Sequence, residues 1–114
     1  MIHTEYRYET RSRDRLLCVT LYGEIDHHGA LALREELDAL LLREHPARLV
    51  LDLASVEFMD SAGLGLLMGR YRLMRELGGV MAIENANERV LKILRLAGME
   101  RFFEIGSRVK GERV

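Results

Sequence analysis

The chain has 114 residues, a length that suits one domain and leaves no room for two. Hydrophobic residues make up 48% and charged residues 31%, a balance that is typical of a globular domain and argues against disorder. Because 17 basic residues stand against 18 acidic ones, the net charge of −1 predicts no bulk attraction to nucleic acid.

The first elements expected along the chain are two strands. Residues 6–9 alternate in polarity and predict a short strand, whereas the charged residues 11–14 predict a turn. Residues 16–22 predict a second, apolar strand that ends at Gly23. Cys18 lies in this strand and is expected in the core, and as the single cysteine it allows no internal disulfide.

A long helix is expected next. Asp26 is a good N-cap for a helix that runs to about Glu44 and ends before Pro46. Its inward stripe is expected to consist of Leu33, Leu37, Leu40 and Leu41. Residues 49–53 predict a strand of the kind that is buried on both faces of a parallel sheet, and residues 56–59 extend or follow it.

The second half of the chain predicts two more helices and two more strands. One helix starts at Asp60 or Ser61 and runs to about Leu77, and another begins at Asn87 and ends at Gly98. Their inward faces are expected to carry Leu64, Leu67, Tyr71 and Met74 in the first and Val90, Leu91, Leu94 and Leu96 in the second. The remaining strands are predicted at residues 80–83 and 102–105.

The predicted order of elements is therefore β-β-α-β-α-β-α-β. Alternation of strands and helices implies an α/β fold, with a mostly parallel mixed sheet of about four to five strands flanked by helices. We expect one small domain over residues 1–106, followed by a C-terminal tail at residues 107–114.

The residue types for a hydrolase or a metal site occur in the chain, but their spacing supports neither. Ser61, a histidine and Asp26 could form a triad, yet no nucleophile-elbow motif surrounds Ser61. His27 and His28 are adjacent in a helix and point about 100° apart, which is poor geometry for chelation. We expect no catalytic residues and no metal.

A partial phosphate-binding motif lies at the start of the second helix. Gly63-Leu64-Gly65 follows a strand and opens a helix, as the dinucleotide fingerprint does, but Met68 stands where its third glycine is needed. The alternative is that Gly65 and Gly69 let this helix pack closely against its neighbour. We expect no cofactor.

Ser61 stands where a strand ends and a helix begins. One interpretation is that its hydroxyl caps the helix. The other is that Asp60 caps the helix and leaves Ser61 exposed at the positive helix end, where the fold would tolerate a phosphate. Such a phosphate would change the charge of the surface near Asp60 and Asp26 without changing the fold.

Three motifs resemble the STAS-domain family of anti-sigma factor antagonists, and the resemblance covers about residues 16–105. They are Gly23-Glu24-Ile25-Asp26-His27-His28, Phe58-Met59-Asp60-Ser61-Ala62-Gly63-Leu64-Gly65 and Gly69-Arg70-Tyr71. The second motif is typical of such antagonists in general. The first and third resemble the sporulation branch, which acts on sigma F, and the general-stress branch is the nearest alternative. Many sporulation members have a second serine where Ala62 stands.

The resemblance implies a switch protein that is not an enzyme. In this family the unmodified antagonist binds an anti-sigma factor that is also a serine kinase, and the released sigma factor joins RNA polymerase. The kinase phosphorylates the serine that corresponds to Ser61, the antagonist dissociates, and a phosphatase restores it. The resemblance places the partner contacts on Asp26, His27, Asp60, Ser61, Gly63 and Gly65.

We also expect a cytoplasmic protein with no membrane contact. No signal peptide is visible, and the longest nearly apolar stretch, at residues 62–69, is too short to span a bilayer.

The alternative function is that of a STAS module that senses a nucleotide or a lipid.

Overall fold

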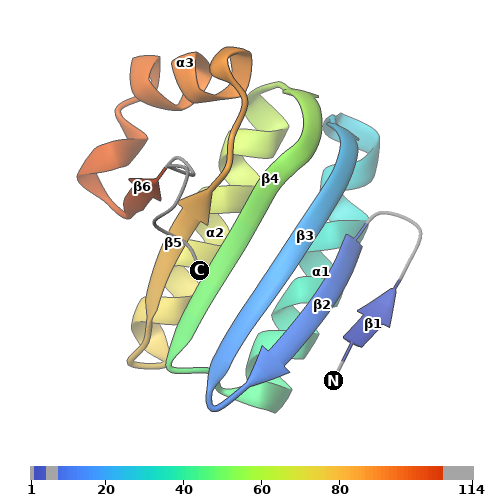
Figure 1. Ribbon diagram of the computed structural model, residues 1–114, viewed down its shortest axis with the longest axis vertical. Helices are drawn as coiled ribbons and strands as arrows, with labels where there is room; N and C mark the ends of the chain where they lie inside the picture. Colours follow the sequence, from blue (N-terminus) through green and yellow to red (C-terminus); the bar gives the residue numbers. More distant parts are fainter. Residues whose placement is uncertain (1, 5–7, 107–114) are drawn as a thin grey trace, which may run out of the picture.

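The computed structural model describes residues 2–4 and 8–106, which form one mixed sheet with helices (Figure 1). The strands are β1 (Ile2–Thr4), β2 (Tyr8–Arg13), β3 (Leu16–Ile25), β4 (Arg48–Met59), β5 (Val80–Glu84) and β6 (Glu104–Gly106). They lie side by side in chain order. The first two pairings are antiparallel and the other three are parallel, as expected when helices connect the later strands.

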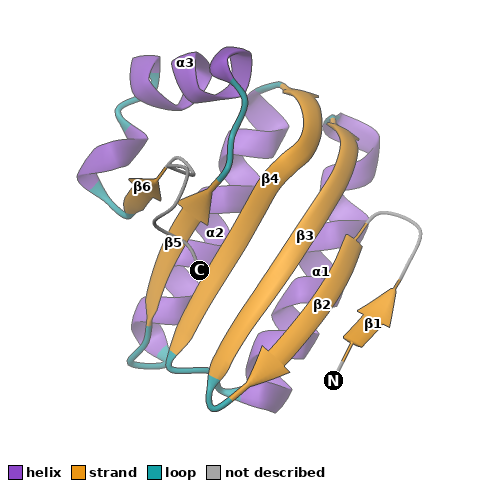
Figure 2. Ribbon diagram, in the orientation of Figure 1, coloured by secondary structure: helices purple, strands orange, loops and turns teal. Residues whose placement is uncertain are grey.

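Three α-helices connect the parallel strands. They are α1 (His27–Glu44), α2 (Ser61–Glu76) and α3 (Glu88–Leu96), and a 3-10 turn, η1 (Met99–Arg101), precedes β6. Helices α1 and α2 lie on one face of the sheet, whereas α3 lies near the ends of β4 and β5 (Figure 2). The predicted α/β class and element order are confirmed, and β1 adds a strand that the sequence did not predict. The predicted tail at residues 107–114 lies outside the described residues.

The first hairpin corrects two predictions. Residues 11–14 do not form the turn, because β2 continues to Arg13 and pairs with β3 as far as Leu16. The turn is made by Asp14 and Arg15, whose φ angles of 52° and 67° suit a tight hairpin. The two arginines of β2, Arg11 and Arg13, are exposed, so this part of its sequence resembles a loop. Residues 6 and 7 of the predicted first strand lie outside the described residues.

Strand β3 is longer than predicted. It does not end at Gly23 but continues to Ile25. The register with β4 shifts between Gly23 and Glu24, and Gly23 has a φ of 79°, so this glycine marks a bulge within the strand. Because of the added residues, β3 ends level with β4, where Ile25 pairs with Met59. The next residue, Asp26, is the N-cap of α1.

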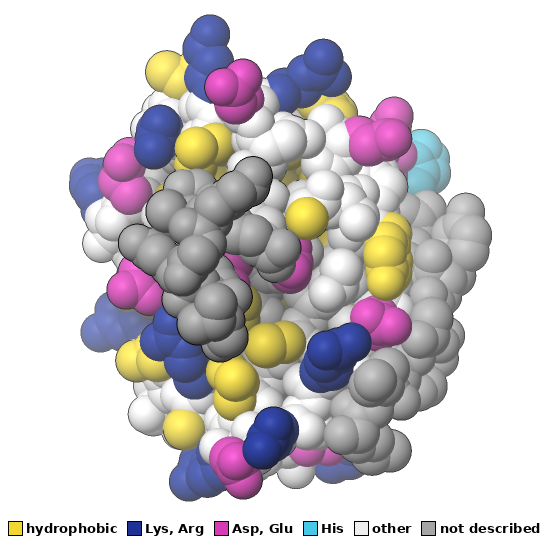
Figure 3. All heavy atoms as spheres, in the orientation of Figure 1, with side chains coloured by type: hydrophobic (Ala, Val, Ile, Leu, Met, Phe, Trp, Pro, Cys, Tyr) yellow, Lys and Arg dark blue, Asp and Glu magenta, His cyan; other side chains and the backbone are white. Residues whose placement is uncertain are grey.

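The core lies between the sheet and the pair α1 and α2. Alternate residues of the central strands face these helices and are buried; they are Leu17, Val19 and Leu21 of β3 and Leu49, Leu51 and Leu53 of β4. Cys18 falls on the opposite face and is only partly buried, so its predicted place in the core was wrong. That opposite face carries a mixture of hydrophobic, acidic and basic side chains (Figure 3).

The predicted helix faces are confirmed in part. Helix α1 buries Leu33, Leu37 and Leu41 as expected. Helix α3 buries Val90 and Leu94, but the side chain of Leu96 is 78% exposed, so its predicted inward position was wrong. Leu96 is the last residue of a nine-residue helix, two residues past the buried turn.

Helix α2 also buries an arginine that the sequence did not predict to be buried. Arg70 faces α1, where its Nε forms an ion pair with Oδ1 of Asp38 at 2.8 Å. The side chain of Arg70 is 4% exposed and that of Asp38 is 34% exposed. Burial lowers the pKa of Arg70, and attraction to Asp38 opposes this effect. The pair joins the two helices.

Candidate functional site

The parallel pairing of β3 and β4 brings two helix starts together. Ile25 pairs with Met59, so the residues that follow, Asp26 and Asp60, lie at the same edge of the sheet. The backbone N–H of Asp60 donates to the carbonyl of Ile25 at 3.4 Å. The N-terminal ends of α1 and α2 are therefore neighbours.

Each helix start is capped by an aspartate. Oδ1 of Asp26 accepts hydrogen bonds from the backbone N–H groups of His28 and Gly29, both at 3.0 Å. Oδ1 of Asp60 accepts from those of Ala62 and Gly63, at 2.8 Å and 3.3 Å. The predicted cap at Asp26 is confirmed, and of the two interpretations for the second helix the structure shows the cap at Asp60.

Ser61 is the first residue of α2 and is exposed. Because Asp60 caps the helix, the Ser61 hydroxyl is not needed for that role, and it makes no hydrogen bond within the described residues. It stands at the positive end of the α2 dipole, where a negative group is stabilised. A modifying enzyme could therefore reach this hydroxyl without unfolding the helix.

The two glycines of the second motif have different surroundings. Gly63 is buried, and a Cβ atom there would lie 2.7 Å from the Cβ of Met59 and 3.2 Å from the carbonyl oxygen of Ile25. A Cβ atom at Gly65 or Gly69 would meet nothing within 4 Å. The expectation that Gly65 and Gly69 permit close packing was therefore wrong, because Gly63 alone of these three has that role.

A groove of about 510 Å³ lies beside Ser61, between the first turns of α1 and α2. Its lining consists of His27, His28, Ala30, Leu31, Arg34, Ala62 and Leu66. Leu31 is 55% exposed, so the groove offers apolar surface to a partner. The only charged or titratable side chains in this lining are His27, His28 and Arg34, which makes the groove neutral to basic.

The sequence analysis did not single out Leu31 or Arg34. A signal was present for Leu31, because it lies outside the stripe of Leu33, Leu37 and Leu41 and so is an apolar residue on the polar side of α1.

Comparison with known proteins identifies the family. A family model for the STAS domain matches residues 7–111. The anti-sigma F factor antagonist of Paenibacillus polymyxa is 38% identical over 90 residues, which span 79% of this chain and 77% of that protein. The anti-sigma-B factor antagonist of Bacillus subtilis is 31% identical over 103 residues, which span 90% and 93% of the two chains. The chain belongs to the STAS domain family.

Solved structures of similar proteins show the same fold as this STAS domain. The unphosphorylated anti-sigma factor antagonist SpoIIAA has a TM-score of 0.78 at 23% identity, covering 92% of this chain and 90% of that one. The phosphorylated form of the Bacillus SpoIIAA has a TM-score of 0.71 at 22% identity, covering 92% and 94%. An anti-sigma factor antagonist from Mycobacterium paratuberculosis has a TM-score of 0.78 at 27% identity, covering 87% and 83%.

The STAS fold brings most of the predicted site residues to one end of the domain. Asp26, His27, Asp60 and Ser61 lie at the starts of α1 and α2, and Gly65 is exposed one turn further along α2. Gly63 is buried at the close approach of α2 to Met59 and Ile25. Within the described ranges, no three His, Cys, Asp or Glu side chains cluster to hold a metal. None of the helices in these ranges has the length and hydropathy of a membrane-spanning segment.

Proposed function

We propose that this STAS domain is an anti-sigma factor antagonist whose binding to an anti-sigma serine kinase is ended by phosphorylation of Ser61. The observation that carries the proposal is the exposed Ser61 hydroxyl at the start of a helix that Asp60 already caps. The names of the similar proteins, which are antagonists of anti-sigma factors, support the same role.

In the unmodified state, the proposed docking face is the edge formed by the two helix starts. Asp26 and Asp60 contribute fixed negative charge there, and the groove at Leu31 and Arg34 contributes apolar and basic surface. The kinase bound to this face would release its sigma factor, which would then join RNA polymerase in the cytoplasm. The antagonist itself performs no chemistry in this scheme.

Phosphorylation would weaken that complex through charge. A phosphoserine carries roughly −1.5 to −2 charge at neutral pH. At Ser61 it would stand next to Asp60 and near Asp26, so the docking face would become strongly negative. Burying such a group without a cationic partner costs several kcal/mol, which is sufficient to dissociate a micromolar complex. The α2 dipole favours the phosphate within the free protein, so no refolding is required, and a phosphatase would restore binding.

Two sigma factors are candidates for the released partner. We favour sigma F, because the sigma F antagonist of P. polymyxa is 38% identical to this chain and the sigma-B antagonist of B. subtilis is 31% identical. The alternative is the general-stress pathway.

The proposal is tested by titration calorimetry with the anti-sigma kinase of the same organism. Ser61→Ala should bind as tightly as the unmodified protein, and Ser61→Asp should bind at least about tenfold more weakly, because a charge would enter the interface. Ser55→Asp is the matched control, since Ser55 is also exposed but lies within β4. Equal binding of Ser61→Ala and Ser61→Asp would refute the proposed switch.

A further inference from the structure

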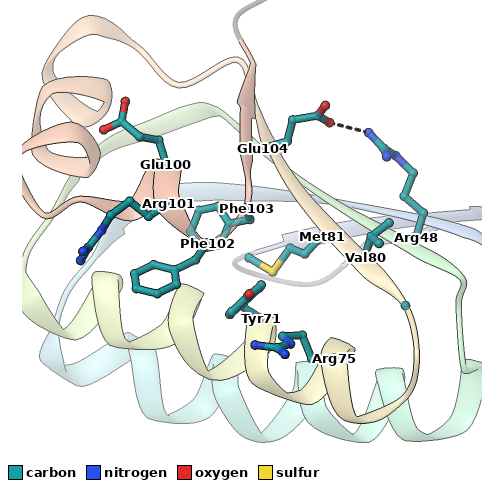
Figure 4. A pocket seen from close by; sticks show the side chains of 11 residues that line it. Arg48, Tyr71, Arg75, Val80, Met81, Glu100, Arg101, Phe102, Phe103 and Glu104 are labelled. Atoms are coloured by element: carbon teal, nitrogen blue, oxygen red, sulfur yellow. Dashed lines mark hydrogen bonds and ion pairs between the residues drawn. The ribbon is translucent and has the colours of Figure 1, made fainter.

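A cavity of about 590 Å³ lies among the side chains of Tyr71, Val80 and Phe102 (Figure 4). It lies between the last turns of α2, the start of β5, and the segment from η1 to β6. Arg75, which lines it, is 14 residues after Ser61, a distance of about 21 Å along a helix that rises 1.5 Å per residue. The cavity is therefore separate from the proposed docking face.

In the wall of the cavity, the ring of Tyr71 packs against those of Phe102 and Phe103. The ring centroid of Tyr71 lies 5.9 Å from that of Phe102 and 5.8 Å from that of Phe103. Phe103 is buried, but Phe102 is 37% exposed, and Val80 on the sheet side is 56% exposed. The cavity thus presents open apolar and aromatic surface of a size that suits a small molecule.

Two arginines of the cavity lie over these rings. The guanidinium carbon of Arg75 is 5.8 Å from the centre of the Tyr71 ring, and that of Arg101 is 5.2 Å from the centre of the Phe102 ring. Such contacts favour a guanidinium position beside the ring, and the N–H groups of these exposed side chains remain available to a ligand. The Nε–H of Arg101 donates to the carbonyl of Gly98 at 3.3 Å, which further fixes its position.

The charges around the cavity leave these two arginines without acidic partners. Arg48 forms an ion pair with Glu104 at 3.2 Å, so these two charges balance each other. The other acidic side chain, Glu100, points away from the aromatic rings in Figure 4. Over residues 8–106, no ion pair joins Arg75 or Arg101 to a carboxylate. The charged side chains among the described lining residues are Arg48, Arg75, Arg101, Glu100 and Glu104, so the cavity carries a net charge of +1, with Arg75 and Arg101 beside the aromatic rings.

We propose that this cavity is a binding site for a small planar anion, that is, an aromatic ring system that carries a carboxylate, sulfonate or phosphate group. The flat part would pack against the partly exposed ring of Phe102, whose plane is tilted by 54° from that of Tyr71, and the anionic group would accept hydrogen bonds from Arg75 and Arg101. Guanidinium groups suit such oxyanions because their N–H groups can bind two oxygens at once. The site requires no contribution from Ser61 and is independent of the proposed switch.

The test is an NMR titration of the ¹⁵N-labelled full chain with naphthalene-2-sulfonate, with neutral naphthalene-2-methanol as the comparison ligand. The sulfonate should shift the amide signals of Val80, Met81 and Phe102 to saturation, and the alcohol should bind at least about tenfold more weakly because it lacks the charge. The double variant Arg75→Ala/Arg101→Ala should bind the sulfonate at least about tenfold more weakly than the unchanged chain does. The matched control is Arg72→Ala/Arg89→Ala, which removes two exposed arginines outside the cavity and should bind as the unchanged protein does.

Three results would overturn the proposal: no saturable shifts at the cavity, equal affinity for the sulfonate and the alcohol, or equal affinity of the Arg75→Ala/Arg101→Ala variant and its control. To exclude a loss of folding as the cause, the amide spectra of both double variants should match that of the unchanged chain away from the substituted residues.

Discussion

Gly63 lies so close to Met59 that a Cβ atom on the glycine would stand 2.7 Å from the Cβ atom of Met59. This contact connects the last residue of β4 to the first turn of α2, two residues after Ser61. It sets how near the start of α2 can approach the sheet. The position of the Ser61 hydroxyl therefore depends on the absence of a side chain at Gly63.

We predict that Gly63→Ala lowers the free energy of unfolding by about 1–3 kcal/mol, because an added methyl group in a filled site forces its neighbours apart. Gly65→Ala is the matched control on the same helix. A Cβ at Gly65 meets nothing within 4 Å, so this change should raise stability by up to about 1 kcal/mol through helix propensity. Urea unfolding measures both values, and equal effects of the two substitutions would contradict the structure.

The ion pair between the helices leads to a second prediction. Asp38→Ala leaves Arg70 charged and buried without its partner, and we expect a loss of about 1–3 kcal/mol, reduced by the partial exposure of Asp38. Arg70→Met removes the charge and keeps most of the volume, so it should cost less than Asp38→Ala. The free energies come from urea unfolding of both variants. A larger loss of stability in Arg70→Met than in Asp38→Ala would contradict this prediction. It would mean that the attraction within the ion pair exceeds the cost of burying Arg70.

The groove beside Ser61 gives a third prediction. Leu31→Asp should weaken binding of the anti-sigma kinase at least about tenfold, because it replaces exposed apolar surface by a charge at the proposed interface. Leu42→Asp is the matched control, since Leu42 is 54% exposed on the same helix but lies outside the groove. Affinity is measured by titration calorimetry. A similar loss in both variants would show that the groove has no special part in docking.

The sequence predicted the parts of this structure that depend on local patterns. Asp26 was predicted as a cap because an aspartate before an apolar periodic segment is a strong local signal, and the structure confirms it. The same signal left Asp60 and Ser61 as competing caps, since both residue types are good acceptors. In the structure, Asp60 is the cap.

Features that depend on distant packing were not predicted. The burial of Arg70 depends on Asp38 of another helix, and no local pattern relates the two residues. The close approach at Gly63 is to Ile25 and Met59, at the ends of β3 and β4. Gly65 and Gly69 lie in the same helix without such a contact, so the residue type alone does not show which glycine is closely packed. The second half of β2 was predicted as a turn because its exposed face carries Arg11 and Arg13, and consecutive polar residues are typical of turns.

The central claim is that an anti-sigma kinase phosphorylates this protein on Ser61. The direct measurement is the intact mass of the purified chain after incubation with that kinase and Mg-ATP, compared with Ser61→Ala and with Ser55→Ala, which removes another exposed serine. We predict one added phosphate on the unchanged chain and on Ser55→Ala, and none on Ser61→Ala. An unmodified chain with a kinase shown to be active on another substrate, or a phosphate that persists in Ser61→Ala, would contradict the account.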